Sequence, residues 1–411
     1  MLLATGLYLV GVFLFTLFTR AFFGISGQSL AYAPLSAASL VLIYLGLTRG
    51  PRNFIQRWYV SSPTIVPGVL FLTGLAISLP NAREVGLAGK DFIRWTFVWL
   101  AFAPATRAIC ADQRRCRLVT QATVIFILLF GALAVGDFFA GGSVTARLLG
   151  SPAISPQGRY QSIYENAGIF AGMLNVAFPL ALVAALSARK WVGRAAWAVG
   201  VAVIVLAMLL SGTRATIAAA LVASVIIFAA RRQWWVLGLV VVIVMGMFAF
   251  AEMPTFGHSP TLTRVHDLMT GRGSGFRSVQ RRLLIWSVAL ELIEKHPFFG
   301  FGGSQLRYLQ HAGFNRAHNA WLDAWLDGGL LSGLAMVMIA CLVLRRAGQT
   351  VFGRIGRYRQ PTHVALVAAS CAVLIGWLVR AGIGSRIDWL PIFLLFSLCW
   401  EPRAEGKIEV A

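Results

Sequence analysis

The sequence predicts an all-α integral membrane protein with about twelve transmembrane helices. Two observations support this fold class. Of the 411 residues, 58% are hydrophobic and 12% are charged, whereas a soluble globular chain has about 45–50% apolar and about 25% charged residues. Apolar runs of about 20 residues, the length that crosses the hydrocarbon core of a bilayer, recur along the whole sequence. The bilayer therefore acts as the solvent, and one helical bundle accommodates the chain.

The apolar runs define the order of the predicted spans. Nine transmembrane helices are expected within 1–252, with short connections and an outer loop near 141–164. A large, partly helical outer loop at 253–319 separates them from three further helices and a tail within 320–411. The predicted spans cover residues 2–19, 29–48, 62–80, 91–109, 118–140, 164–187, 195–211, 214–230, 234–252, 320–344, 363–380 and 387–401.

The distribution of Lys and Arg predicts the orientation of the chain. If the N-terminus is cytoplasmic, the even-numbered connections and the C-terminal tail carry about twice as many Lys and Arg residues as the short loops of the other side. Both termini are therefore expected in the cytoplasm. The net charge of +21 includes these clusters, so it is explained by the positive-inside rule, and no nucleic-acid partner is expected.

An amphipathic helix is predicted inside the large outer loop, at 279–296. Pro297 follows this helix and marks its end. Loops of this length are uncommon in compact proteins unless they are functional, so the loop is expected to carry part of a site. The apolar residues that recur at helical spacing are Leu283, Trp286, Leu290 and Ile293.

Three arginines are candidate anion ligands on the outer side. Arg214 begins the eighth span within the small-residue segment 211–216, where a charge at membrane depth is costly. Arg281 and Arg282 lie near the start of the loop helix, and a planar guanidinium matches two phosphate oxygens at once. The alternatives are an interfacial arginine at Arg214 and a solvated helix face at Arg281 and Arg282.

His318 is the candidate general base, because a histidine exchanges a proton near neutral pH. It lies where the large loop meets the tenth span; the alternative is a packed or capping histidine. Asn319 follows it as a candidate substrate-binding residue. Asp323 and Asp327 lie one and two turns further on, and we expect them either to orient nearby donors or to cap the helix and pair with arginines.

The shorter outer loop contributes Arg147 and Arg159 as further candidate anion-binding residues. Asn166 enters the sixth span as a buried polar group that needs a partner in hydrocarbon. It is expected either to hold the bundle together or to bind substrate hydroxyls. The outer loops contain no acidic pair at an obvious metal-ligand spacing. No metal and no cofactor are therefore expected, and arginines would neutralise an anionic leaving group instead.

Three segments in this order resemble the signature region of the O-antigen ligase and polymerase superfamily, which covers roughly residues 200–345. The first runs from Arg282 in the loop helix to the aromatic and glycine-rich stretch 296–302. The second, 317–322, contains His318, and the third is 327–333. Within the superfamily the sequence looks most like an O-antigen ligase.

The resemblance implies transfer of O-antigen polysaccharide from undecaprenyl pyrophosphate to lipid A–core, in the periplasmic leaflet of the Gram-negative inner membrane. It also implies an inverting reaction without metal or nucleotide, with the lipid-linked donor, the lipid A–core acceptor and membrane lipids as partners. The family's essential histidine corresponds to His318, and its paired arginines correspond to Arg214 and Arg282, with Arg281 as a substitute for Arg282.

Other functions remain open at this point. An O-antigen polymerase or a protein O-oligosaccharyltransferase shares much of this pattern and differs in its acceptor. A lipid-linked sugar transporter would need charged residues or broken helices at the centres of the spans. Most spans here are apolar at their centres, and the polar residues gather at the outer ends, which argues against transport.

Overall fold

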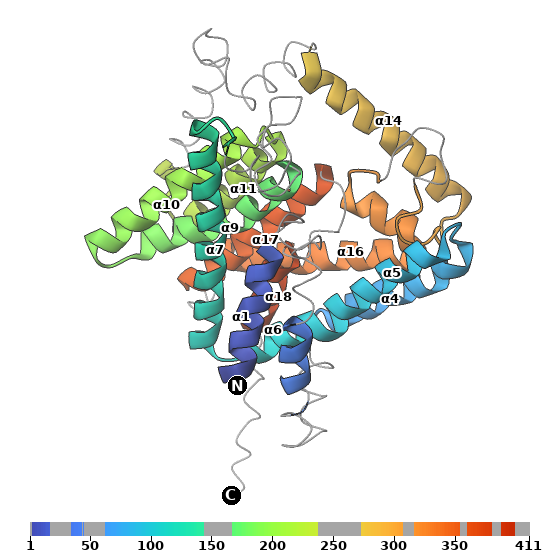
Figure 1. Cartoon of the computed structure of the whole chain (residues 1–411), viewed down its shortest axis with the longest axis horizontal. Helices are drawn as coiled ribbons and strands as arrows, with labels where there is room; N and C mark the ends of the chain where they lie inside the picture. The colour runs from blue at the N-terminus through green and yellow to red at the C-terminus, as the bar shows by residue number, and fades with distance from the viewer. Residues whose placement is uncertain are drawn as a thin grey trace, which may run out of the picture.

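The structure is a computed structural model that describes residues 2–16, 34–42, 44, 62–143, 167–236, 273–306, 316–353, 360–379 and 388–398. Every regular element within these ranges is a helix (Figure 1), as the sequence predicts. The first part of the chain forms α1 (Leu2–Thr16), a helical segment at 34–42, α4 (Ile65–Ser78), η2 (Leu79–Asn81), α5 (Val85–Phe97), η3 (Val98–Phe102), α6 (Ala103–Cys110) and α7 (Gln113–Phe139).

The second part of the chain supplies the rest of the bundle and one peripheral helix. Its elements are α9 (Ala167–Ser187), α10 (Trp191–Leu210), α11 (Arg214–Ala230), α14 (Gly273–Lys295), α16 (Ala320–Phe352), α17 (Pro361–Val379) and α18 (Trp389–Leu398). The predicted loop helix corresponds to α14, which begins at Gly273 rather than near 279.

Five of the described helices are long and apolar enough to cross a membrane: α7, α9, α10, α16 and residues Pro361–Leu378 of α17. Shorter apolar helices occur at Leu3–Val12, Ile65–Asn81 and Arg214–Ala230. This set indicates a multi-pass membrane protein. The count of about twelve spans stays a prediction, and the predicted span at 234–252 lies largely outside the described residues.

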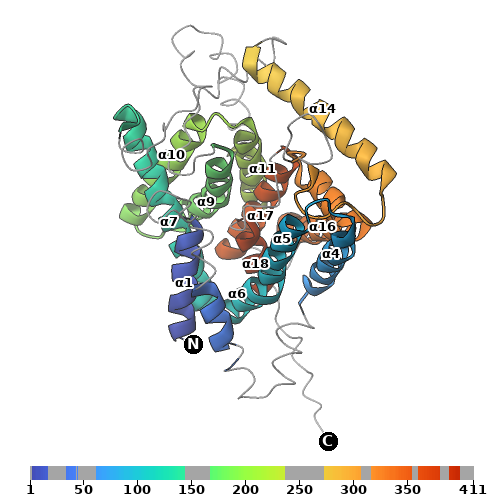
Figure 2. The same cartoon turned by 45° about the vertical axis from the view of Figure 1, so that its right-hand side comes forward.

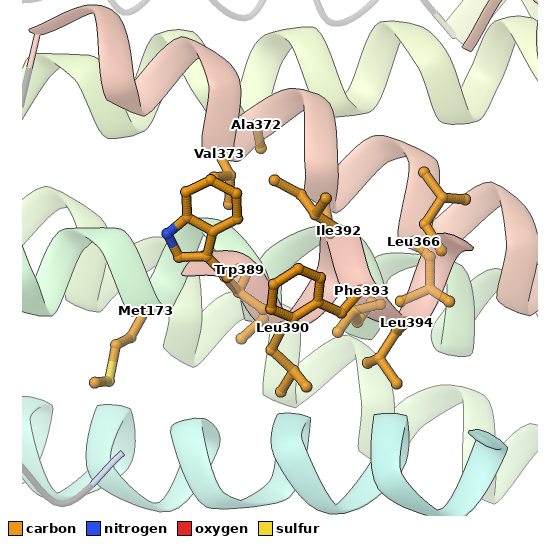
Figure 3. Packing of buried hydrophobic residues seen from close by; sticks show 14 of the residues in the cluster. Met173, Leu366, Ala372, Val373, Trp389, Leu390, Ile392, Phe393 and Leu394 are labelled. Atoms are coloured by element: carbon orange, nitrogen blue, oxygen red, sulfur yellow. The ribbon is translucent and has the colours of Figure 1, made fainter. Parts of the chain in front are cut away.

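The bundle core is built from small residues and aromatic rings. Helix α17 packs against α9, α11 and α16, and α18 packs against α6 and α17. At its centre, the Trp389 ring lies 4.8 Å from the Trp377 ring and 5.2 Å from the Trp99 ring, measured between centroids. Figure 3 shows Trp389 and Phe393 among apolar side chains such as Val373. Offset and edge-on contacts of this kind stabilise aromatic clusters, and here they join α18 to α17 and η3.

Helices α4 and α16 approach each other until their backbones nearly touch. A Cβ atom on Gly74 would lie 2.4 Å from the carbonyl oxygen of Gly328. The Ser332 hydroxyl donates to the Phe71 carbonyl across the same contact, at 3.0 Å. Small residues permit such close packing between membrane helices, so the position of α4 fixes the position of the first half of α16.

Helix α16 is broken by a kink that the sequence analysis did not predict. Gly328 has φ −129° and Gly329 has φ 66°, so the helical hydrogen-bond pattern is interrupted there. The loop that follows α14 satisfies the freed backbone groups. The N–H of Phe301 donates to the Leu326 carbonyl at 2.7 Å, and the N–H of Gly302 donates to the Asp327 carbonyl at 3.0 Å. Non-helical backbone is tolerated at such a position because protein groups replace the missing bonds.

Helix α14 lies at the periphery of the molecule, with its C-terminal end near the beginning of α16 (Figures 1 and 2). A separate small core holds it there: Ile285, Ala289 and Ile293 pack with Phe301 and Leu326. These residues recur every four positions, so they share one face of the helix.

The apolar stripe predicted for this helix was therefore partly wrong. Ile293 is buried, but Leu283 and Leu290 are each 55% exposed. Apolar residues occur on more than one face of α14, so helical spacing alone does not decide which face is buried. Contacts with residues far away in the sequence determine which face of α14 is buried. One of them is the hydrogen bond from the Trp286 indole to the Ala317 carbonyl, at 3.0 Å.

Candidate active site

His318 lies on the surface, and the charges of two of the predicted arginines reach it. Its side chain is exposed, and it precedes the first turn of α16. Desolvation by surrounding atoms lowers the pKa of His318, and the positive charges of Arg282 and then Arg281 lower it further. The structure thus brings the imidazole within electrostatic range of both arginines. A lowered pKa keeps the ring neutral at physiological pH, the form that accepts a proton.

The residues on either side of His318 hold its backbone in place. The Ala317 N–H donates to the Asp323 carboxylate at 2.8 Å, and the Ala317 carbonyl accepts from the Trp286 indole N–H. The Asn319 side-chain oxygen caps α16, accepting from the N–H groups of Trp321 at 3.0 Å and Leu322 at 3.3 Å. Asparagine is among the preferred residues at this position. Asp323 therefore orients a nearby donor, the Ala317 N–H, which is one of the two roles predicted for it.

Between these anchors, His318 adopts φ 54°, a left-handed conformation that non-glycine residues seldom take. Such a conformation persists only when the surrounding structure enforces it, and it is frequent at functional sites. Here the enforcement comes from the hydrogen bonds on Ala317 and Asn319.

Arg316 links three distant parts of the chain just before His318. Its guanidinium lies 3.3 Å from the Asp327 carboxylate of α16 and 3.3 Å from the Asp91 carboxylate of α5. Ser304, from the loop after α14, donates its backbone N–H to Asp327 at 3.0 Å, and its hydroxyl bonds to both Asp91 and Arg316. We name Asp91, Ser304, Arg316 and Asp327 the Arg316 bridge. Asp327 thus pairs with an arginine, one of its two predicted roles.

The loop that carries Ser304 is docked on the turn between α4 and α5. Gln305 is 1% exposed and makes two hydrogen bonds with the backbone of Glu84, at 2.9 and 3.1 Å. Asn81 donates its side-chain N–H to the Gly300 carbonyl at 3.2 Å. Gly302 has φ 87°, and a Cβ atom there would lie 2.8 Å from the Cβ of Ala82, so a larger residue would push the loop away.

The structure describes only one of the remaining predicted site residues, Arg214. Arg214 is the first residue of α11, follows the tight turn at Gly212 and is partly exposed. That Arg214 and His318 belong to the same site stays a prediction. Arg147, Arg159 and Asn166 lie outside the described residues. Within the described part of the chain, no three His, Cys, Asp or Glu side chains form a group suited to a metal ion.

Sequence reasoning missed the contribution of Asp91. It was assigned to the edge of an apolar span, and an isolated carboxylate at such a position requires a partner. That requirement was the available signal, but it does not identify the partner. Arg94, three residues further on, pairs with Asp91 at 3.2 Å, but the partner in the candidate site, Arg316, is 225 residues away in the sequence. Gln305 carried no comparable signal.

One comparison with known proteins bears on this site. Residues 199–338 match the family model described as O-antigen ligase. This region belongs to the O-antigen ligase family. The match includes His318 and the arginines Arg214, Arg281 and Arg282. It indicates a glycan-transferring enzyme of the O-antigen ligase or polymerase type, which uses lipid-linked glycan substrates. No protein of curated function matches the chain.

Proposed function

We propose that this protein is an O-antigen ligase. It transfers O-antigen polysaccharide from undecaprenyl pyrophosphate to lipid A–core at the periplasmic face of the Gram-negative inner membrane. The observation that carries the proposal is the exposed His318 within electrostatic range of Arg281 and Arg282, inside the region that matches the O-antigen ligase family.

The proposed reaction is a single displacement at the anomeric carbon. A hydroxyl of the acceptor sugar forms the new glycosidic bond, and the bond from the anomeric carbon to the pyrophosphate oxygen breaks. The neutral His318 imidazole takes the proton of that hydroxyl, and undecaprenyl pyrophosphate leaves with the electron pair. One displacement inverts the anomeric configuration and needs no metal or nucleotide.

The arginines act on the leaving group. Arg282 and Arg214 hold the diphosphate and stabilise the charge that develops on it, because guanidinium donors pair well with phosphate oxygens. Arg281 is exposed next to Arg282 on α14 and serves as a second or substitute contact. Arg147 and Arg159 are proposed as further anion contacts from the shorter outer loop.

The two asparagines are proposed to contact sugar hydroxyls. Asn166 remains assigned from the sequence alone. Asn319 already uses its side-chain oxygen to cap α16, so its amide N–H groups are the part proposed to bind a sugar oxygen.

The Arg316 bridge has a positioning role in this proposal. It connects α5, the loop after α14 and α16 immediately before His318. Reaction rates depend steeply on the placement of reacting groups, and a shift of about 1 Å costs about 100-fold. The bridge thus supports the imidazole without touching the substrate.

The test is complementation of a strain that lacks the gene. Wild-type protein should restore long-chain lipopolysaccharide, whereas His318→Ala should lower transfer by about 100- to 10,000-fold, the usual contribution of a general base. The membrane content of the variant protein is measured in parallel, to show that it inserts. Full activity of inserted His318→Ala would rule out the catalytic assignment.

The phenotype of the deletion strain distinguishes the two family activities. Loss of a ligase leaves intact lipid A–core without O-chain and accumulates lipid-linked polymer. Loss of a polymerase leaves lipid A–core that carries a single repeat unit. The second phenotype would replace the ligase proposal with an O-antigen polymerase that uses the same residues.

A further inference from the structure

A small cavity that opens to the outside of the bundle lies between the beginning of α4 and the η3–α6 segment. The helices α4 and α5 separate it from the candidate active site. Ile65, at the first turn of α4, lines the cavity, whereas Asn81 and Glu84, at the other end of this helix pair, bind the loop that carries Ser304. The cavity and the candidate active site therefore occupy opposite ends of the α4–α5 hairpin.

The polar part of the cavity is suited to an anion. Arg107 of α6 lines it and is only 8% exposed. Ser62 and Thr64 line the same cavity, and their hydroxyls are hydrogen-bonded to each other at 2.8 Å. None of the lining residues within the described part of the chain is acidic. A guanidinium withdrawn from water is favoured by an anion, and a fork of N–H donors with two hydroxyls matches phosphate oxygens.

The remaining lining is apolar and reaches the outside of the bundle. Trp99 and Leu72 line the cavity wall, and Val69 and Leu100 line it as well while being 52% and 45% exposed. In a membrane protein such exposed aliphatic side chains contact lipid tails. The cavity thus joins a phosphate-binding corner to a surface for acyl chains, a combination that a free phosphate ion would not require.

The surrounding charge favours an anionic lipid over a zwitterionic one. Arg114 and Arg117 are exposed in the first turns of α7, directly after the helix that carries Arg107. Basic pockets between membrane helices at the positively charged side bind anionic headgroups. We propose that this cavity binds an anionic phospholipid, with its phosphate on Arg107, Ser62 and Thr64 and its acyl chains along α4 and η3. The inference does not depend on the proposed glycan transfer.

The test measures thermal unfolding of the purified full chain in detergent micelles. The probes are phosphatidylglycerol, phosphatidylcholine and inorganic phosphate, each added separately. Phosphatidylglycerol should raise the unfolding midpoint by several degrees, because a ligand that binds the native state stabilises it. Phosphatidylcholine should raise it less, since its choline cation meets the arginines, and inorganic phosphate should not raise it. Native mass spectrometry should show phosphatidylglycerol retained by the protein.

Substitutions in the cavity distinguish binding of the lipid at this site from nonspecific contact of lipid with the apolar surface. Arg107→Gln should weaken phosphatidylglycerol binding by about tenfold or more, the usual cost of losing a hydrogen bond to a charged group. Thr64→Val keeps the side-chain size and removes one hydroxyl, so it tests the site if Arg107→Gln does not fold, and it should weaken binding by a smaller factor. The matched control is Arg194→Gln, an exposed arginine of α10 that does not line the cavity, which should bind as the wild type does.

Three outcomes would overturn the proposal. Equal stabilisation by phosphatidylglycerol and phosphatidylcholine would indicate solvation of the apolar surface alone. An equal effect of inorganic phosphate would indicate a free-anion site and no lipid. Unchanged phosphatidylglycerol binding by folded Arg107→Gln, or by Thr64→Val where Arg107→Gln does not fold, would show that the lipid binds elsewhere.

Discussion

At the scale of single residues, the candidate site concentrates positive charge around one neutral imidazole. Arg281 and Arg282 hold the pKa of His318 below its usual value, after desolvation has lowered it. The same charges suit a diphosphate leaving group. In the proposed mechanism one pair of arginines serves two purposes, because it keeps the base unprotonated before an anionic substrate arrives and stabilises that substrate afterwards.

Replacing Arg281 tests this electrostatic relation. Arg281→Gln removes a positive charge near His318, so the pKa of His318 should rise toward its usual value. A base is active when deprotonated, so the acidic limb of the pH–rate profile should move to higher pH. The measurement is the pH dependence of kcat/KM for glycan transfer by purified protein. Arg277→Gln, an exposed arginine one turn earlier on α14, is the control and should not move the limb.

Asp91 tests the positioning role of the Arg316 bridge. Asp91→Asn removes the charge that holds Arg316 from the α5 side. We expect kcat to fall by about 10- to 100-fold through misplacement of His318, with little change in KM. Asp91→Glu, which keeps the charge, should restore part of kcat.

The control for this variant is Asp112→Asn, which changes an exposed carboxylate that caps α7. Asparagine is an equally good cap, so activity should persist. An Asp91→Asn enzyme with unchanged kcat would show that the bridge does not position the histidine.

Sequence reasoning identified candidates for the chemistry more readily than the residues that hold the candidate site together. His318 and the arginines were identifiable because charged and titratable groups are rare at a membrane boundary and require an explanation. Ser304 and Gln305 were not, because a serine or glutamine in a loop has no distinctive pattern. Their roles arise from long-range contacts with α5 and the turn before it.

At the scale of helices, the kink in α16 is the feature that shapes the site. The apolar pattern predicted one continuous span there, since helical periodicity continues through both glycines. The kink depends on the loop at 298–302, whose N–H groups satisfy the carbonyls that the break frees. Periodicity reports which face is apolar and does not report such a nonlocal exchange of hydrogen bonds.

Gly329→Ala tests the kink directly. Gly329 has φ 66°, and a Cβ atom there would lie 2.1 Å from the Phe298 carbonyl oxygen. The strained backbone alone costs about 1–3 kcal/mol, and the collision with the loop adds to it. We expect a lower thermal unfolding midpoint in detergent and a loss of transfer activity. The control Gly348→Ala lies in the same helix with nothing within 4 Å of the added Cβ, and it should be neutral or stabilising.

At the scale of the whole molecule, orientation follows from charge. The sequence predicts cytoplasmic basic connections and a periplasmic site, and the long apolar helices agree with a multi-pass arrangement. The exact number of spans was less accessible, because several short apolar helices, such as α4 and α11, fall below the length of a full crossing.

Single cysteines test this orientation in intact cells. In a chain without its native cysteines, Glu294→Cys on α14 should react with a membrane-impermeant maleimide from the periplasm. Lys190→Cys, in the turn between α9 and α10, should react only after the inner membrane is opened. Both positions are exposed, so accessibility within the protein does not separate them. The reverse pattern of labelling would invert the predicted topology and move the proposed site to the cytoplasm.

The candidate site depends on contacts between segments that are far apart in the sequence. These contacts limit which segments can be exchanged between related proteins by recombination. The region that matches the O-antigen ligase family begins at residue 199, but one of the two carboxylates that pair with its Arg316 is Asp91, and its loop binds Asn81 and Glu84. A chimaera that receives 199–338 alone would carry Arg316 with Asp327 but without Asp91, and it would lack the residues that bind the loop. Exchanges between relatives should therefore carry the α4–α5 hairpin along with the catalytic segment.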